Sequence, residues 1–154
     1  MSIVIINSNN IHSSNLNILI NVIYNNFSHI NNEPELNHNK TNIRKTLQSS
    51  DPQLFFVMVN KKVAAYLLGE IIKLDDGRKV LYVTYLYTSS QFRNKGFASK
   101  LLNTAEHIKN TKHIDGIMLT CESTNKKNYN FYVNKGFMPD ILLRTYDKYE
   151  VMYK

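Results

Sequence analysis

A stretch of small and basic residues near the middle of the chain has the composition of an anion-binding turn. A run rich in Tyr, Val and Thr ends at Thr88, and residues 93–99 then read RNKGFAS. A helix that begins near Gly96 offers backbone N–H groups without intrahelical acceptors, and its dipole adds about half a positive charge. Gly96 and Ala98 leave that backbone open to a phosphate, and Arg93 adds a full charge. Neither the glycine spacing of a dinucleotide fold nor that of a P-loop is present.

Hydrophobic periodicity predicts the elements that position this turn. Strands are expected at 3–6, 54–59, 63–74, 79–88 and 114–122, with one or two more within 141–153. Helices are expected at 16–27 with Ser13 or Ser14 as the cap, at 41–47, at 97–108, and up to Asn134 with Ser123 or Thr124 as the cap. The sequence Asp75-Asp76-Gly77-Arg78 predicts a hairpin, so the three middle strands form an antiparallel meander. Together these elements predict one α/β (α+β) domain over residues 1–154.

Alternation along the predicted strand 79–88 divides its side chains between two faces. Tyr82, Thr84, Leu86 and Thr88 are expected on one face, and Tyr85 and Tyr87 on the other. One set would line a pocket and the other would pack against a helix. The pattern leaves open which set does which.

Composition excludes several classes of protein. The chain has 154 residues, 43% of them hydrophobic, which suffices for one buried core without a disulfide or a metal. Its only cysteine, Cys121, excludes an intrachain disulfide and is expected to be a small buried residue. The net charge of +7 lies entirely in residues 78–154, where an anionic partner is therefore expected. The first residues resemble neither a signal peptide nor a membrane span, which favours a soluble, cytoplasmic protein.

Two motifs in this order resemble those of the GNAT superfamily of N-acetyltransferases. Arg93-x-x-Gly96-x-Ala98 after a strand is similar to Arg/Gln-x-x-Gly-x-Gly/Ala, and residues 125–137 are similar to Asn-x-x-Ala-x-x-Phe-Tyr-x-x-x-Gly-Phe. The departures remove no essential backbone donor; they are Ser90 for Pro, Asn94 for Gly and Asn128 for Ala. The resemblance implies a mixed, mostly antiparallel sheet of six to seven strands with about four helices, splayed between strands 4 and 5.

The resemblance also implies a co-substrate, acetyl-CoA, and no metal. The turn would hold its pyrophosphate, and the main chain of Leu86 and Thr88 would pair with its pantetheine arm. The expected cofactor-binding residues are Leu86, Tyr87, Thr88, Arg93, Asn94, Lys95, Gly96, Phe97, Ala98, Ser99, Asn125 and Asn128. Tyr132 would donate a proton to the departing thiolate of CoA. Glu122, Glu70 or an ordered water would take the proton of the amine.

The implied reaction is direct attack of a primary amine on acetyl-CoA in a ternary complex. The acceptor is either a small amine (polyamine, aminosugar or amino acid) or a peptide or protein amine, and the protein is a monomer or a homodimer. A polyamine would need a carboxylate-lined pocket; the candidates are Glu33, Glu35, Asp75, Asp76 and Glu122. One alternative is a catalytically silent CoA-binding or regulatory domain. A basic nucleic-acid-binding protein is the least favoured, because the Lys- and aromatic-rich stretch 126–135 already belongs to the second motif.

Overall fold

The computed structural model describes residues 1–6, 8–11, 15–144 and 147–154. Its strands are β1 (Ser2–Ile6), β2 (Pro52–Val59), β3 (Lys62–Lys73), β4 (Lys79–Thr88), β5 (Gly116–Glu122), β6 (Met138–Pro139) and β7 (Tyr149–Tyr153). Its helices are α1 (Ser8–Ile11), α2 (Leu16–Asn26), α3 (Lys40–Leu47), α4 (Phe97–Thr111) and α5 (Lys126–Asn134), with single 3₁₀ turns η1 (Ser28–Ile30), η2 (Pro34–Leu36) and η3 (Ser90–Phe92). The expected caps Ser13 and Ser14 lie outside the described residues.

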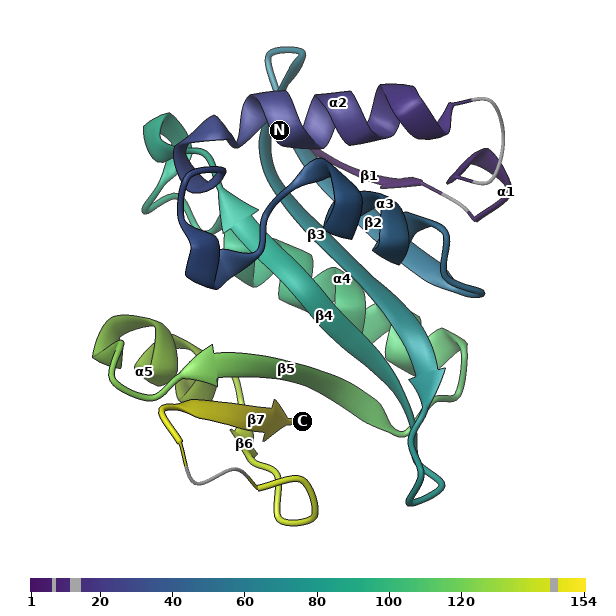
Figure 1. Cartoon of the computed structure of the whole chain (residues 1–154), viewed down its shortest axis with the longest axis vertical. Helices are drawn as coiled ribbons and strands as arrows, with labels where there is room; N and C mark the ends of the chain where they lie inside the picture. Colours follow the sequence, from purple (N-terminus) through teal and green to yellow (C-terminus); the bar gives the residue numbers. More distant parts are fainter. Residues whose placement is uncertain (7, 12–14, 145–146) are drawn as a thin grey trace.

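All seven strands form one sheet in the order β1-β2-β3-β4-β5-β7-β6 (Figure 1). The first four strands pair antiparallel in sequence order, which extends the expected meander by β1. The hairpin between β3 and β4 turns at Gly77, whose φ is 97°. Only the β4–β5 pair is parallel. The mixed, mostly antiparallel sheet predicted from the sequence is confirmed.

The parallel pair separates after a few residues. β4 and β5 pair only where Val80–Val83 face Gly116–Leu119. Beyond Val83, β4 stays paired to β3 on its other edge, and β5 stays paired to β7 as far as Glu122. In Figure 1 the arrowheads of β4 and β5 point apart. The expected splay is therefore present, and it exposes the backbone edge of β4 from Thr84 to Thr88.

A β-bulge in β4 overturns the predicted division of its side chains. Leu68 faces Tyr85 and Gly69 faces Val83, so Thr84 is an extra residue without a partner on β3. A Cβ on Gly69 would collide with the carbonyl of Tyr82, which explains the glycine at this close approach. Because the extra residue reverses the alternation, the prediction that Tyr82, Thr84, Leu86 and Thr88 share one face was wrong. Leu86 packs with Leu81 and Val83, whereas Tyr85 and Tyr87 pack on the opposite face.

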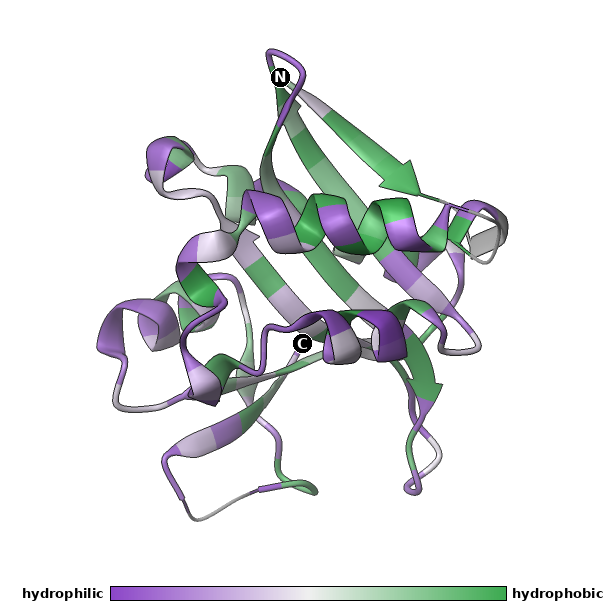
Figure 2. Ribbon diagram, turned by 45° about the horizontal axis from the view of Figure 1, so that its top comes forward, coloured by the Kyte–Doolittle hydropathy of each residue, from purple (hydrophilic) through white to green (hydrophobic). Residues whose placement is uncertain are grey.

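Apolar side chains form one core on each face of the sheet. One core lies under α4 and α5 and includes Leu101, Ala105 and Phe137. The other lies under α1, α2 and α3 and includes Ile23 and Tyr66. Figure 2 shows apolar residues gathered along the sheet, while the helices are striped with polar ones. No helix in the described ranges is long and apolar enough to cross a bilayer.

The C-terminal third differs from prediction at three boundaries. The fifth strand begins at Gly116 rather than at residue 114. Neither Ser123 nor Thr124 caps α5; the Asn125 side chain does so by accepting the N–H of Asn128. The strands expected within 141–153 are limited to β7, and β6 precedes that range. A side-chain cap and a short edge strand both depend on contacts that hydropathy does not record.

Arg78 ties the β3–β4 hairpin to the connection between β6 and β7. Its guanidinium lies 2.7 Å and 3.0 Å from the two carboxylate oxygens of Asp140, and 2.8 Å from Asp76. It also stacks on the ring of Tyr153, 4.6 Å from the centroid. Asp140 is 5% exposed, and the Arg78 guanidinium holds the pKa of its carboxyl below the usual range. This is the ion pair in the described residues that is most shielded from solvent.

Candidate active site

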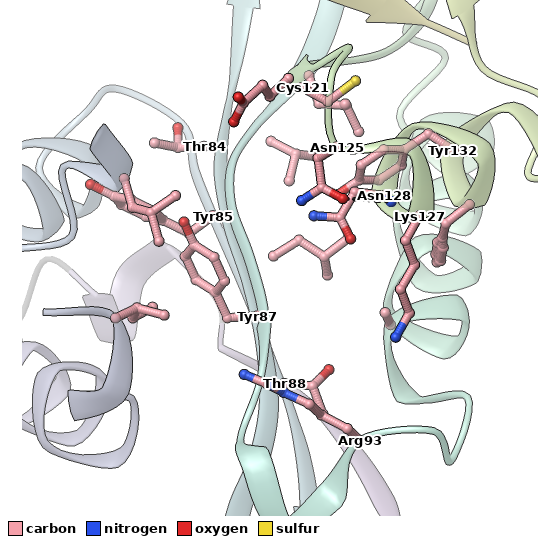
Figure 3. Close-up of a pocket in the computed structure, with 18 of the residues that line it drawn as sticks. Thr84, Tyr85, Tyr87, Thr88, Arg93, Cys121, Asn125, Lys127, Asn128 and Tyr132 are labelled. Carbon is pink, nitrogen blue, oxygen red and sulfur yellow. Dashed lines mark hydrogen bonds between the residues drawn. The ribbon is translucent and has the colours of Figure 1, made fainter. Parts of the chain in front are cut away.

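A cavity of about 1240 Å³ opens between the separated ends of β4 and β5. Its walls come from the end of β4, the start of α4, the end of β5, the first turns of α5, and residues 29–37. In Figure 3, Tyr85 and Tyr87 lie on one side of β4, and Asn125, Asn128 and Tyr132 lie on the other. The cavity therefore has two halves, one on each side of β4. One half lies beside α4 and α5, and the other lies beside Tyr85, Tyr87 and residues 29–37. Residues 29–37, which lie between α2 and α3, are called segment 29–37 from here on.

The start of α4 forms one end of the cavity. Gly96 is the N-cap in the left-handed conformation, with φ of 76°, and no described side chain caps the helix. Asn94 is also left-handed, with φ of 62°. The first N–H groups of α4 therefore lie at the cavity wall together with Arg93, Lys95 and Lys127. Unpaired donors and three cations suit a phosphate group.

Tyr132 lies in the opposite wall, on α5. Its ring packs edge-on against Phe131 at 5.3 Å and Phe137 at 5.8 Å, which fixes its direction. Burial, with a smaller contribution from Cys121, raises the pKa of the Tyr132 hydroxyl to about 12. The phenol therefore stays protonated at neutral pH and is a hydrogen-bond donor.

The two expected proton acceptors lie in different places. Glu122 lines the cavity, accepts a hydrogen bond of 2.7 Å from Thr124, and lies 3.8 Å from the ammonium of Lys148. Glu70 does not line this cavity; it lines a neighbouring one of about 510 Å³ beside α3. The structure therefore brings Glu122 to the site and leaves Glu70 outside it.

All the other expected site residues line the same cavity as Tyr132 and Glu122. Cys121 also lines it, but it is 7% exposed, and burial raises the pKa of its thiol, which disfavours a nucleophilic thiolate. No cluster of three or more His, Cys, Asp or Glu side chains in the described part of the chain could hold a metal ion.

Segment 29–37 lines the cavity, and only Glu33 and Glu35 of it were named as candidates from the sequence. His29, Glu33 and Glu35 line the cavity, and Lys148 links Glu35 to Glu122 with 3.8 Å to each carboxylate. Among the polyamine-binding candidates, Glu33, Glu35 and Glu122 converge here, whereas Asp75 and Asp76 do not line the cavity. The segment is rich in asparagine and has no helical or strand period, so the sequence did not indicate that its residues would meet Glu122 at one cavity.

A buried histidine borders the cavity behind this segment. His38 is 2% exposed, and its ring nitrogens lie 2.7 Å from Asn31 Oδ1 and 2.6 Å from the Tyr66 hydroxyl. Its ring packs edge-on against Tyr85 at 5.2 Å and Tyr87 at 5.6 Å. Burial, and to a lesser extent the charge of His29, lowers the pKa of His38 to about 4. The imidazole is therefore neutral in the folded protein at physiological pH.

This shift predicts that His38 makes the fold sensitive to acid. The pKa is near 6.5 in the unfolded chain and about 4 in the folded one, so the unfolded chain binds the proton first. The contribution of neutral His38 is complete above pH 6.5 and is lost as the pH falls towards 4, at a cost of roughly 3 kcal/mol. Urea unfolding of wild type and His38→Gln between pH 7.5 and 4.5 measures it. The variant should lose less stability than wild type over this range, and parallel losses would contradict the assignment.

Comparison with known proteins agrees with this geometry. The model of the acetyltransferase (GNAT) family matches residues 20–137, which include the splay, the α4 turn and α5. The chain belongs to the GNAT family. Within this family, N-alpha-acetyltransferase 30 of Xenopus laevis is 32% identical over 99 residues, which are 62% of this chain and 35% of that protein. The chain thus spans about a third of the length of this curated relative.

Solved structures share the fold over nearly the whole chain. The PaiA N-acetyltransferase of Thermoplasma acidophilum, in complex with coenzyme A, is 20% identical with a TM-score of 0.67, covering 100% of this chain and 99% of that one. The ribosomal-protein-S18-alanine N-acetyltransferase of Escherichia coli is 14% identical with a TM-score of 0.73, covering 99% and 91%. At these identities the likeness establishes the GNAT fold.

Proposed function

We propose that the protein transfers the acetyl group of acetyl-CoA to a primary amine. The observation that carries this proposal is the cavity between β4 and β5, which joins an uncapped helix start at Gly96 to the hydroxyl of Tyr132. A diphosphate at one end and a thioester sulfur at the other would span such a cavity. Family membership supports the same activity, and the similar Thermoplasma protein was solved with coenzyme A.

In this proposal the α4 start holds the pyrophosphate of acetyl-CoA. The N–H groups of Phe97, Ala98 and Ser99 donate to it, and Arg93 and Lys95 supply positive charge. The unpaired edge of β4 from Leu86 to Thr88 pairs with the amides of the pantetheine arm, as a neighbouring strand would. Asn125 and Asn128 border the arm from α5.

The chemistry requires two proton movements and one charge-stabilising contact. The amine nitrogen bonds to the acetyl carbon, the carbon–sulfur bond breaks, and the amine proton passes to water or Glu122. A backbone N–H on the free edge of β4 stabilises the carbonyl oxygen, for which such donors contribute roughly 10²–10³ in rate. Tyr132 donates to the departing sulfur. Its high pKa keeps the donor protonated but disfavours complete transfer, so Tyr132 contributes a hydrogen bond in the transition state and the departing thiolate takes its proton from solvent.

The other half of the cavity suits a cationic acceptor. Glu33, Glu35 and Glu122 line it, and the rings of Tyr85 and Tyr87 form its floor. An ammonium is attracted to the carboxylates and loses its proton before attack. Small polyamines, aminosugars and peptide α-amines all satisfy this chemistry, and two of the similar proteins are named for peptide or protein amines.

Calorimetry and thiol release together test the proposal. Purified protein is titrated with acetyl-CoA, and CoA release is then followed with spermidine, kanamycin and a pentapeptide with a free α-amine. Turnover of at least one acceptor is the expected result. Binding without turnover would favour a silent CoA-binding domain. Absence of acetyl-CoA binding would contradict the proposal, and salt-sensitive binding of nucleic acid would then favour the basic alternative.

Arg93→Met is expected to weaken acetyl-CoA binding roughly 10- to 100-fold, because a hydrogen bond to a charged group contributes about 1.5–3 kcal/mol. Calorimetry at two salt concentrations measures the change, and the variant should show the weaker salt dependence. The matched control is Arg44→Met on α3, where the guanidinium donates to Asn17 at 2.8 Å and does not line the cavity. Equal effects of the two substitutions would remove Arg93 from the phosphate site.

A further inference from the structure

Segment 29–37 is held together by local backbone bonds only. It consists of the turns η1 and η2 between α2 and α3, and its backbone hydrogen bonds within the described residues all join positions three apart, such as Ile30 to Phe27 and Asn37 to Pro34. Ile30 is its one buried apolar side chain. Turns of this kind do not hold their position on a sheet, because short 3₁₀ segments are marginal by themselves. Side chains must therefore fix where the segment lies relative to β4.

The ring of His38 makes one of these connections. Asn31 donates through Nδ2 to the carbonyl of Tyr24 at 3.0 Å, so its Oδ1 faces His38 and accepts from Nδ1 at 2.7 Å. Nε2 is then the unprotonated nitrogen, and it accepts from the hydroxyl of Tyr66 at 2.6 Å. Tyr66 is fully buried on β3. The His38 ring, directly after segment 29–37, thus joins Asn31 in the middle of that segment to Tyr66 in the sheet.

The same ring contacts the floor of the half of the cavity that is proposed to bind the amine, which we call the acceptor half. Its edge packs against Tyr85 and Tyr87, which line the cavity. The Tyr85 hydroxyl donates to the carbonyl of Asn37 at 2.7 Å, directly before His38 in the chain. His38 itself does not line the cavity. It therefore sits between two walls of the acceptor half and touches both.

We propose that His38 is a positioning residue that sets the spacing between segment 29–37 and β4, and through it the affinity for the amine acceptor. This inference rests on the proposed function for the identity of that half of the cavity. Acetyl-CoA would be held by α4, α5 and the backbone edge of β4. His38 instead packs against the rings of Tyr85 and Tyr87, which lie on the other side of β4 (Figure 3). Loss of His38 should therefore raise the acceptor KM and leave acetyl-CoA binding unchanged.

Two substitutions separate the hydrogen bonds of His38 from its bulk. His38→Leu removes both bonds, whereas His38→Gln retains one donor and one acceptor in reach of Asn31 and Tyr66. With spermidine, kanamycin and the pentapeptide, His38→Leu should raise the acceptor KM roughly tenfold. The acceptor KM of His38→Gln should lie close to that of wild type. The Kd of acetyl-CoA should stay within about twofold in both. Hydrogen exchange at residues 29–38 should accelerate roughly tenfold in His38→Leu alone.

Further variants keep the test decisive if His38→Leu folds poorly. Tyr66→Phe removes one bond and keeps the buried ring, so it should reproduce the KM change in smaller measure. Ile108→Ala, at the far end of α4, removes core contacts without touching segment 29–37 and is the control for lost stability. Acceptor KM values for His38→Leu and Tyr66→Phe that match Ile108→Ala would overturn the inference, as would an equal change in acetyl-CoA binding.

Failure of the proposed function would look different. Wild type would then turn over none of the three acceptors, and hydrogen exchange without substrate would decide the role of His38. Faster exchange confined to residues 29–38 in His38→Leu would support positioning of the segment. Exchange at the wild-type rate there would overturn it.

Discussion

Replacing Tyr132 by phenylalanine is expected to lower kcat roughly 10²-fold, with the Kd of acetyl-CoA within about twofold of wild type. The substitution removes one hydroxyl and leaves the ring packed between Phe131 and Phe137, so the cavity keeps its shape. Under the proposed mechanism, the substitution removes only the hydrogen bond to the departing sulfur. Pre-steady-state and steady-state thiol release, with calorimetry for binding, separate these effects.

The pH profile gives a second check on Tyr132. Because its pKa is about 12, the hydroxyl stays protonated, and wild-type kcat should show no loss attributable to Tyr132 up to about pH 10. Tyr129→Phe is the matched control: Tyr129 lies on the same helix one turn earlier and does not line the cavity. A kcat for Tyr132→Phe equal to that of Tyr129→Phe would remove Tyr132 from the mechanism.

Arg78→Met is expected to destabilise the fold by about 3–5 kcal/mol, because it leaves a buried carboxylate unpaired. Asp140 is 5% exposed and accepts hydrogen bonds of 2.7 Å and 3.0 Å from the Arg78 guanidinium. The Asp140 side chain also accepts the N–H of Leu143, so the turn after β6 depends on the same carboxylate. Chemical denaturation at neutral pH measures the loss.

Two controls separate burial from charge in this prediction. Lys109→Met breaks an ion pair with Glu106 that is 3.4 Å long and more exposed than the Arg78–Asp140 pair, and it should cost at most about 1 kcal/mol. Adding Asp140→Asn to Arg78→Met should recover part of the lost stability, since the uncompensated charge is then absent. Similar losses for Arg78→Met and Lys109→Met would show that Asp140 is effectively solvated.

Local patterns in the sequence were sufficient for much of the fold. The strands β1 to β5 and the helices α2 to α5 could be predicted because each has its own hydrophobic period and nearby breaking residues. Gly77 was assigned to a hairpin turn and Gly96 to a helix start, and both have positive φ. The α4 start was found for the same reason, since a helix N-terminus collects its donors within four consecutive residues.

Contacts between distant residues decided what the sequence did not reveal. The bulge at Thr84 arises from the partner strand, where Gly69 approaches the backbone of Tyr82, and it reversed the faces of β4. Glu70 seemed equivalent to Glu122 in the sequence because both lie in strands. The structure separates them, since the two carboxylates line different cavities.

By itself, then, the sequence determined the order of elements, the β3–β4 hairpin and the helix start at Gly96, because neighbouring residues form each of these features. Only the tertiary structure decided the surroundings of the other half of the cavity, where Glu35, His38, Tyr66, Glu122 and Lys148 come from four separate parts of the chain. Their meeting depends on how the layers pack on the sheet. That packing is a sum of many long-range contacts, and no short pattern of residues encodes it.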